Sequence, residues 1–186
     1  MTFSEEVDRP QQLVAAARAL ANETGSAAFT VSQLAARAGV SLKAFYSCFA
    51  SKDDLLLALL AHDSRIGADL LVERIGARVG PGALGAYVHE LFEMLTLPGA
   101  LGYAGVLVRE YRRLTEVHDD ALRDALAPLV DLLARHIDSD DAKRHARTMF
   151  GVLLEGIHDI VVGRAADPDE LARYLERFCT RGVAGR

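Results

Sequence analysis

The sequence of 186 residues has few of the features that mark secreted, membrane or metal-dependent proteins. Its only cysteines, Cys48 and Cys179, lie far apart, which excludes a disulfide framework and a zinc-ligand spacing. No apolar run approaches the ~18 residues that a membrane helix needs, because charged side chains interrupt each run. The start, MTFSEEVDRP, carries acids where a signal peptide carries basic charge followed by apolar residues. We therefore expect a cytoplasmic protein with reduced thiols and no membrane partner.

The chain also lacks an excess of basic residues. Its 21 Lys and Arg against 26 Asp and Glu give a net charge of −5, which argues against a protein that coats nucleic acid without selectivity. The 51% hydrophobic content excludes a disordered chain. One stretch differs from the rest, because residues 30–52 contain Arg37, Lys43 and Lys52 but no acid. If the protein binds a polyanion, we expect the polyanion to bind at this stretch.

No segment has the alternating pattern of a strand, and the periodicity is helical throughout. Leu13, Ala17 and Leu20 form the stripe of a first helix that ends near Gly25. Thr30 and Gln33 form a capping box at the start of a second, short helix. Ser41 caps a third helix, and Ser51 opens a fourth that we expect to run to Arg78.

Helix breakers and start signals in the rest of the chain predict five longer helices, which brings the expected total to about nine helices. Gly and Pro breakers separate them, and Asp138-Ser139 and Pro168 mark two starts. The expected ranges are 83–96, 100–114, 117–137 (interrupted or kinked at Pro128), 140–162 and one that begins at 168. The fold class is thus all-α, with a three-helix unit over residues 1–51 and a larger helical domain over residues 52–186.

The second and third helices are joined by Ala38-Gly39-Val40-Ser41, which has the length and glycine of a helix-turn-helix. Phe45 and Phe49 are four residues apart and are expected to face inward. Lys43, Ala44, Tyr46 and Ser47 then form the outward face, whose mostly small side chains can enter a major groove.

Residues 13–59, and above all TVSQLAARAGVSLKAFYSCFASKDDLL, resemble the DNA-binding domain of the TetR family of bacterial repressors. The resemblance is carried by Thr30, Leu34-Ala35, residues 38–41, Phe45-Tyr46, Phe49 and Ser51-Lys52. It implies a dimeric helical domain that binds a small molecule and moves two DNA-binding units. The partners it implies are a palindromic double-stranded operator, a small-molecule effector and a second copy of the chain, with no cofactor and no enzymatic activity.

Within this resemblance, side chains at helix ends or flanks are expected to contact phosphates, and those on the outward face of the third helix to read bases. Lys52 beside a helix N-terminus would act with the backbone amides on one phosphate. Arg9 either reaches the DNA backbone or is solvated, and Cys48 is expected to be a small, partly buried side chain rather than a redox sensor. The predicted DNA-binding residues are Thr30, Gln33, Ser41, Lys43, Ala44, Tyr46, Ser47 and Lys52.

Aromatic and aliphatic side chains of the middle helices are expected to wall a cavity for a mainly apolar effector with few polar anchors. The predicted ligand residues are Tyr87, Leu91, Met94, Tyr103, Leu107, Glu110, Tyr111 and His158. The segment Met149–Gly163 is apolar on nearly all sides, so we expect it to be both core and dimer interface. The predicted interface residues are Phe150, Leu153, Leu154, Ile157, Val161, Leu171 and Leu175.

Two alternative functions remain open. One is a DNA-binding protein without a ligand response, and the other is a helical enzyme or carrier that contains a helix-turn-helix. No nucleophile–base arrangement or phosphate loop favours an enzyme. Glu155 and His158 have half of a di-iron spacing, but no second copy follows, so no metal site is predicted.

Overall fold

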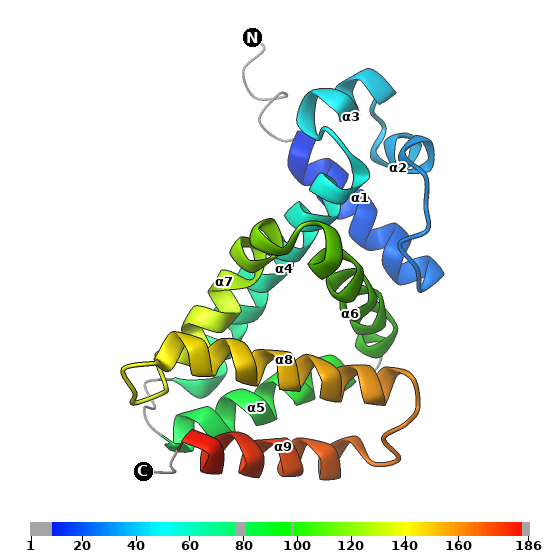
Figure 1. The fold of residues 1–186 in the computed structure, drawn as a ribbon. Coiled ribbons are helices and arrows are strands. Elements are labelled where there is room, and N and C mark those ends of the chain that lie inside the picture. Colours follow the sequence, from blue (N-terminus) through cyan, green and yellow to red (C-terminus); the bar gives the residue numbers. More distant parts are fainter. Residues whose placement is uncertain (1–8, 77–80, 98, 184–186) are drawn as a thin grey trace.

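The computed structural model describes residues 9–76, 81–97 and 99–183, and within these ranges it consists of helices and connecting turns without strands. The described helices are α1 (Arg9–Thr24), α2 (Val31–Ala38), α3 (Leu42–Cys48), α4 (Lys52–Ile75), α5 (Pro81–Thr96), α6 (Ala100–Val117), α7 (Asp119–Ala134), α8 (Ala142–Val161) and α9 (Pro168–Val183). Figure 1 shows α1–α3 gathered at one end and α5, α8 and α9 stacked at the other. The all-α class and the nine-helix count are confirmed for these ranges.

Local capping chemistry fixes the start of each short helix. The Thr30 hydroxyl accepts from the Gln33 amide at 3.1 Å, and the Gln33 side chain accepts from the Thr30 amide at 2.8 Å. This is the reciprocal capping box that the sequence predicts. Ser41 accepts from the amide of Ala44 at 3.1 Å to begin α3. Between α2 and α3, Gly39 has φ of 67°, a left-handed conformation that strains residues with a side chain.

The long helix α4 joins the two ends of the molecule. Ser51 and Asp54 form a second capping box at its start. Leu55 and Leu59 pack in a cluster with the side chains of α1–α3, whereas Leu71 and Ile75 belong to the cluster of the opposite end. The predicted boundary between residues 51 and 52 therefore falls at the start of a helix whose first half packs with the N-terminal unit.

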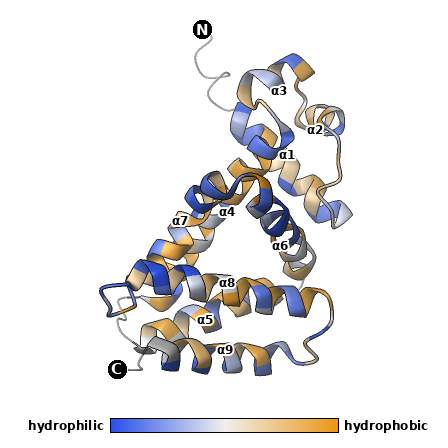
Figure 2. Ribbon diagram, viewed as in Figure 1, coloured by the Kyte–Doolittle hydropathy of each residue, from blue (hydrophilic) through white to orange (hydrophobic). Residues whose placement is uncertain are grey.

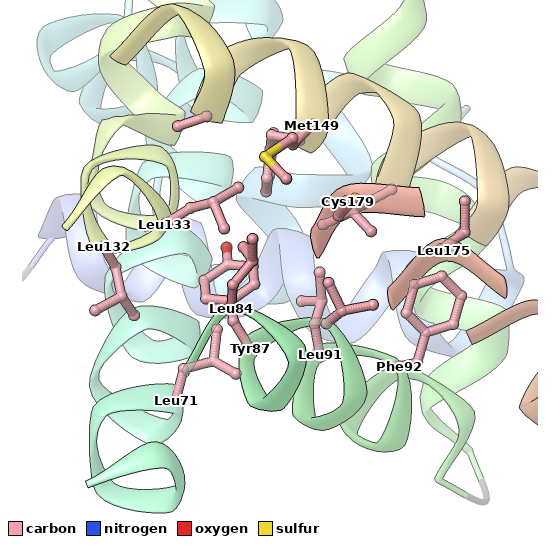
Figure 3. Close-up of a cluster of buried hydrophobic side chains, with 14 of the residues drawn as sticks. Leu71, Leu84, Tyr87, Leu91, Phe92, Leu132, Leu133, Met149, Leu175 and Cys179 are labelled. Atoms are coloured by element: carbon pink, nitrogen blue, oxygen red, sulfur yellow. The ribbon is translucent and has the colours of Figure 1, made fainter. Parts of the chain in front are cut away.

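Figure 3 shows the larger cluster, where side chains from α4, α5, α7, α8 and α9 meet. Tyr87 lies at its centre, fully buried, and donates a hydrogen bond to the carbonyl of Leu129 at 3.2 Å. Burial raises the pKa of the Tyr87 phenol. Figure 2 shows that α8 and α9 carry hydrophilic residues as well as apolar ones, because one side of each helix packs on the core. Neither helix is enclosed by its own chain.

Some predicted helix ends are wrong. The sixth helix continues to Val117, and the seventh begins at Asp119, ends at Ala134 and runs through Pro128 without interruption. Asp138-Ser139 does not cap α8, which begins at Ala142. Instead the Ser139 hydroxyl accepts a hydrogen bond from the backbone amide of Asp141 at 3.2 Å. This bond closes a turn that ends just before α8 begins. The fourth helix ends at Ile75, and the predicted end at Arg78 lies outside the described residues.

Among the described residues, no single helix is long and apolar enough to cross a membrane. Only α5 and α6 taken together meet that length and composition, and they are bent by 110° relative to each other.

Candidate DNA interface and ligand cavity

The turn between α2 and α3 opens into a hollow of about 430 Å³. Four of the predicted DNA-binding residues line it together, namely Ser41, Lys43, Ala44 and Ser47. Gly39 and Val40 of the turn and Arg9 from the start of α1 also line it. The hollow thus gathers two cations with small side chains on the outward face of α3. Arg9, which the sequence leaves between two interpretations, lies beside the predicted base-reading residues.

The other predicted DNA-binding side chains flank this hollow. Tyr46 is 57% exposed and lies edge-on to Phe45, with ring centroids 5.1 Å apart. Phe45 is fully buried under α1 and α2, so the predicted division of α3 into an inner and an outer face holds. Thr30 and Gln33 are both exposed at the start of α2, where they bond to each other.

Lys52 has a structural role that the sequence does not reveal. Its ammonium donates to the backbone carbonyl of Ala27 and lies 4.8 Å from the centre of the Phe29 ring. Burial lowers the pKa of Lys52, an effect that outweighs the opposing influence of the nearby Glu110. The side chain thereby fastens the α1–α2 loop to the start of α4.

A separate cavity of about 150 Å³ lies inside the helical body, bounded by α4, α5, α6, α7 and α8. Leu91, Met94, Leu107 and Tyr111 line it as predicted. The sequence analysis missed most of the other lining side chains, including Asp63 and Ser64 on α4. The position of Ser64 could have been predicted, since Leu60, Ser64 and Ala68 follow at a helical spacing of four, which places Ser64 in a core register.

The remaining predicted ligand residues do not line this cavity. Tyr87 is a core residue, as described above. Tyr103 donates to Asp63 at 2.5 Å, and Glu110 accepts from Arg113 at 2.8 Å. Nε2 of His158 lies 3.2 Å from the Arg112 guanidinium. Tyr103 thus contacts a carboxylate of the cavity wall, whereas Glu110 and His158 contact arginines of α6.

Helix α6 connects the cavity wall to the DNA-binding end. One side of α6 presents Leu107 and Tyr111 to the cavity. From the same helix, Arg109 donates to the carbonyl of Gly25 at 2.6 Å, and Arg113 donates to both carboxylate oxygens of Asp53 at 2.6 and 3.0 Å. The bond to Arg113 is the main reason that the pKa of Asp53 lies below its usual value.

A further contact joins α1, α4 and α6. Arg18 on α1 pairs with Asp63, which also accepts from the Tyr103 hydroxyl. Asp63 is in turn one of the residues that line the cavity. The cavity wall and the first helix of the DNA-binding end therefore share a carboxylate.

Most of the predicted dimer-interface residues are already buried within the single chain. Phe150, Leu153, Ile157 and Leu175 are at most 5% exposed, and Leu154, Val161 and Leu171 are partly buried against the same core. The outer side of α9 carries Tyr174 and Phe178, which are 54% and 52% exposed. Their rings stack with centroids 6.4 Å apart. The sequence analysis missed this pair, although the spacing of four residues on an amphipathic helix could have revealed it.

Glu155 and His158 both contact the same arginine of α6. The Arg112 guanidinium pairs with Glu155 and contacts His158. Among the described residues, no group of three or more His, Cys, Asp and Glu side chains could hold a metal ion.

Comparison with known proteins agrees with this arrangement. Residues 13–59 match the family of bacterial regulatory proteins described as the tetR family. The whole fold is similar to a TetR transcriptional regulator from Rhodococcus sp. RHA1, with a TM-score of 0.75, 19% identity and coverage of 95% of this chain and 96% of that one. No curated protein matches the sequence.

Two further solved structures contain bound molecules. FadR from Bacillus subtilis in complex with stearoyl-CoA has a TM-score of 0.71 and 19% identity, over 93% of this chain and 98% of that one. The multidrug binding protein EbrR complexed with ethidium has a TM-score of 0.67 and 25% identity, over 91% and 97% of the two chains.

The fold and the helix-turn-helix define a DNA-binding regulator with a separate helical body. Residues 13–59 thus match the helix-turn-helix domain of the tetR family of bacterial regulatory proteins, and the whole chain has the fold of TetR transcriptional regulators.

Proposed function

We propose that the protein is a homodimeric cytoplasmic repressor that binds a palindromic operator and is released by a small, mainly apolar effector. In this proposal residues 1–51 contact DNA, and residues 52–186 bind the effector and form the dimer. The main support for this proposal is the position of α6. This helix lines an apolar cavity, and it also contacts the α1–α2 loop through Arg109 and the start of α4 through Arg113. A ligand that shifts α6 would change the position of the DNA-binding unit.

The similar structures support an effector of this kind. Their bound molecules, stearoyl-CoA and ethidium, carry charged groups but also have large apolar parts, and only the apolar parts support this proposal. The cavity here is lined mostly by aliphatic and aromatic side chains, which favours an apolar molecule by the hydrophobic effect.

On the DNA side, we assign base reading to Lys43, Ala44 and Ser47, which line the hollow on α3. Phosphate contacts fall to Tyr46, Lys52, Thr30 and Gln33 at the flanks, and Ser41 caps α3 at the rim of the hollow. Arg9 joins this set as a phosphate contact, because it lies on the same hollow. Phosphate contacts position the protein, whereas contacts to base edges supply specificity.

Replacing Lys43 with alanine is therefore expected to narrow the affinity difference between operator and random DNA by about 1–3 kcal/mol, if its amine pairs with a guanine edge. Lys52→Gln keeps a donor for the Ala27 carbonyl but removes the charge, so it should weaken binding to both DNAs equally and reduce the salt slope by about one per contact. Titrations of both variants against operator and scrambled duplex at two salt concentrations measure these effects. Equal losses for Lys43→Ala on both duplexes would make Lys43 another phosphate contact.

We infer a dimer because one DNA-binding unit contacts only a short stretch of DNA. A single short recognition helix reads few base pairs, and useful specificity needs two half-sites about 34–36 Å apart. The exposed Tyr174 and Phe178 extend the surface of α8 and α9 beyond the buried residues of the sequence prediction. We therefore place the dimer contact on the outer faces of these two helices.

A salt-dependent gel shift on the DNA that flanks the gene tests the proposal. The expected result is a specific complex that small apolar molecules, first selected from a thermal-shift panel, dissociate. A specific complex that no metabolite relieves would favour a regulator without a ligand response. Stabilisation by strongly polar or polyanionic molecules alone would overturn the apolar effector.

A further inference from the structure

The cavity in the helical body contains one polar side chain without a partner. Ser64 is 2% exposed, lines the cavity, and its hydroxyl has no hydrogen-bond partner in the part of the chain that the structure describes. A buried hydroxyl without a hydrogen bond costs free energy, and native proteins rarely leave one unsatisfied. Apart from Asp63 and Tyr111, the other side chains that line the cavity are apolar and supply no acceptor or donor. A bound molecule could supply the missing hydrogen bond.

The neighbouring acid does not compete for this role. Asp63 also lines the cavity, but Arg18 pairs with its carboxylate and Tyr103 donates to it at 2.5 Å. Its charge is thus balanced by a guanidinium. Because no unpaired charge of either sign lines the cavity among the residues that the structure describes, a charged ligand would lose its hydration without gaining a counter-ion.

The size of the cavity limits the ligand further. Its volume is about 150 Å³. A dry cavity of roughly this size holds a molecule as large as benzene. Larger effectors would have to widen the space between the helices.

We propose that the cavity binds a neutral, single-ring aromatic or similarly compact apolar molecule whose one polar group hydrogen-bonds to Ser64. This inference rests on the proposed function and specifies the effector class at the same site. Asp63 immediately precedes Ser64 on α4 and is paired with Arg18 of α1. A ligand held by Ser64 therefore lies next to the contact that joins the cavity wall to the DNA-binding end.

The test is isothermal titration of the full chain with four probes: toluene, phenol, benzoate and benzylammonium. We expect phenol and toluene to bind, and the two charged probes to bind at least tenfold more weakly. In Ser64→Ala the phenol-to-toluene affinity ratio should fall about threefold to tenfold, because only phenol loses a hydrogen bond. Ser139→Ala, which changes a serine in the α7–α8 connection outside the cavity, should leave the ratio unchanged.

Each other outcome overturns the proposal. If the phenol-to-toluene affinity ratio is unchanged in Ser64→Ala, or falls only in Tyr111→Phe, the polar group of the ligand does not bind Ser64. Tightest binding of benzylammonium makes Asp63 the anchor, and failure of both neutral probes excludes this ligand class. A lower unfolding free energy of ligand-free Ser64→Ala shows that the hydroxyl has a structural partner. The operator gel shift tests the proposed repressor function separately, so its result is independent of whether Ser64 binds the ligand.

Discussion

Replacing both Tyr174 and Phe178 with glutamate is expected to convert the dimer into a monomer and to weaken operator binding about 100-fold or more. Both side chains are more than half exposed on the outer side of α9, and their rings stack on each other. In a two-fold symmetric contact the same patch occurs on both subunits, so the new carboxylates would face their own copies. Repulsion and lost apolar burial then oppose association. A monomer keeps one half-site contact but loses the gain of linked binding.

Light scattering at micromolar concentration measures the first effect as a fall from twice 20.1 kDa to 20.1 kDa. Val117→Glu is the matched control, because Val117 is 60% exposed and lies at the α6–α7 turn, away from α9 (Figure 1). This variant should remain dimeric. If the double variant stays a dimer, the subunits meet through another surface. If it becomes a monomer with full operator affinity, the half-site argument is wrong.

The sequence predicted best the features that depend on residues close together along the chain. The capping box at Thr30, the helix starts at Ser41 and Ser51 and the inward face of α3 each depend on groups within four residues. Their chemistry is the same wherever the helix lies in the fold. The hollow at the turn between α2 and α3 follows from them, because Ser41, Lys43 and Ser47 are fixed once α3 and its turn are fixed.

Features that depend on distant residues were not predictable in this way. Arg113 and Asp53 are 60 residues apart, and no periodicity links them. An apolar stripe such as that of α8 indicates that a face is buried but not which helix covers it. Leu153 and Ile157 could equally have faced a second copy of the chain, yet they pack inside their own. For the same reason, the sequence analysis predicted Tyr87 as a ligand residue, whereas the structure places it in the core.

Loop lengths explain the errors at helix ends. The change from α6 to α7 takes place at His118, which ends one helix and begins the next, so no run of turn residues marks it. At α8, Asp138-Ser139 has the composition of a cap but lies one turn early, because Ser139 bonds within the loop. Cap-like residues thus indicate a nearby helix start without fixing its position.

Replacing Phe45 with alanine is expected to lower the unfolding free energy of the DNA-binding end by about 3–5 kcal/mol and to abolish operator binding. Phe45 is fully buried on the short helix α3, in the cluster that joins it to α1, α2 and the first half of α4. Its ring also contacts Phe49, with centroids 6.0 Å apart. Because α3 has only seven residues, it lacks the length to be stable alone and depends on this contact.

Tyr46→Ala is the control that separates stability from DNA contact, because it removes the neighbouring, exposed ring from the same helix. Chemical denaturation should show a change within about 0.5 kcal/mol for Tyr46→Ala, as expected of an exposed site. Gel shifts should nevertheless show weaker DNA binding for it, since a phosphate contact is lost. Phe45→Ala should keep the helical body folded, so circular dichroism should retain most of the helical signal. If Phe45→Ala bound operator normally, α3 would not need its inner face to hold Lys43, Ala44 and Ser47 in position, and the DNA interface would lie elsewhere.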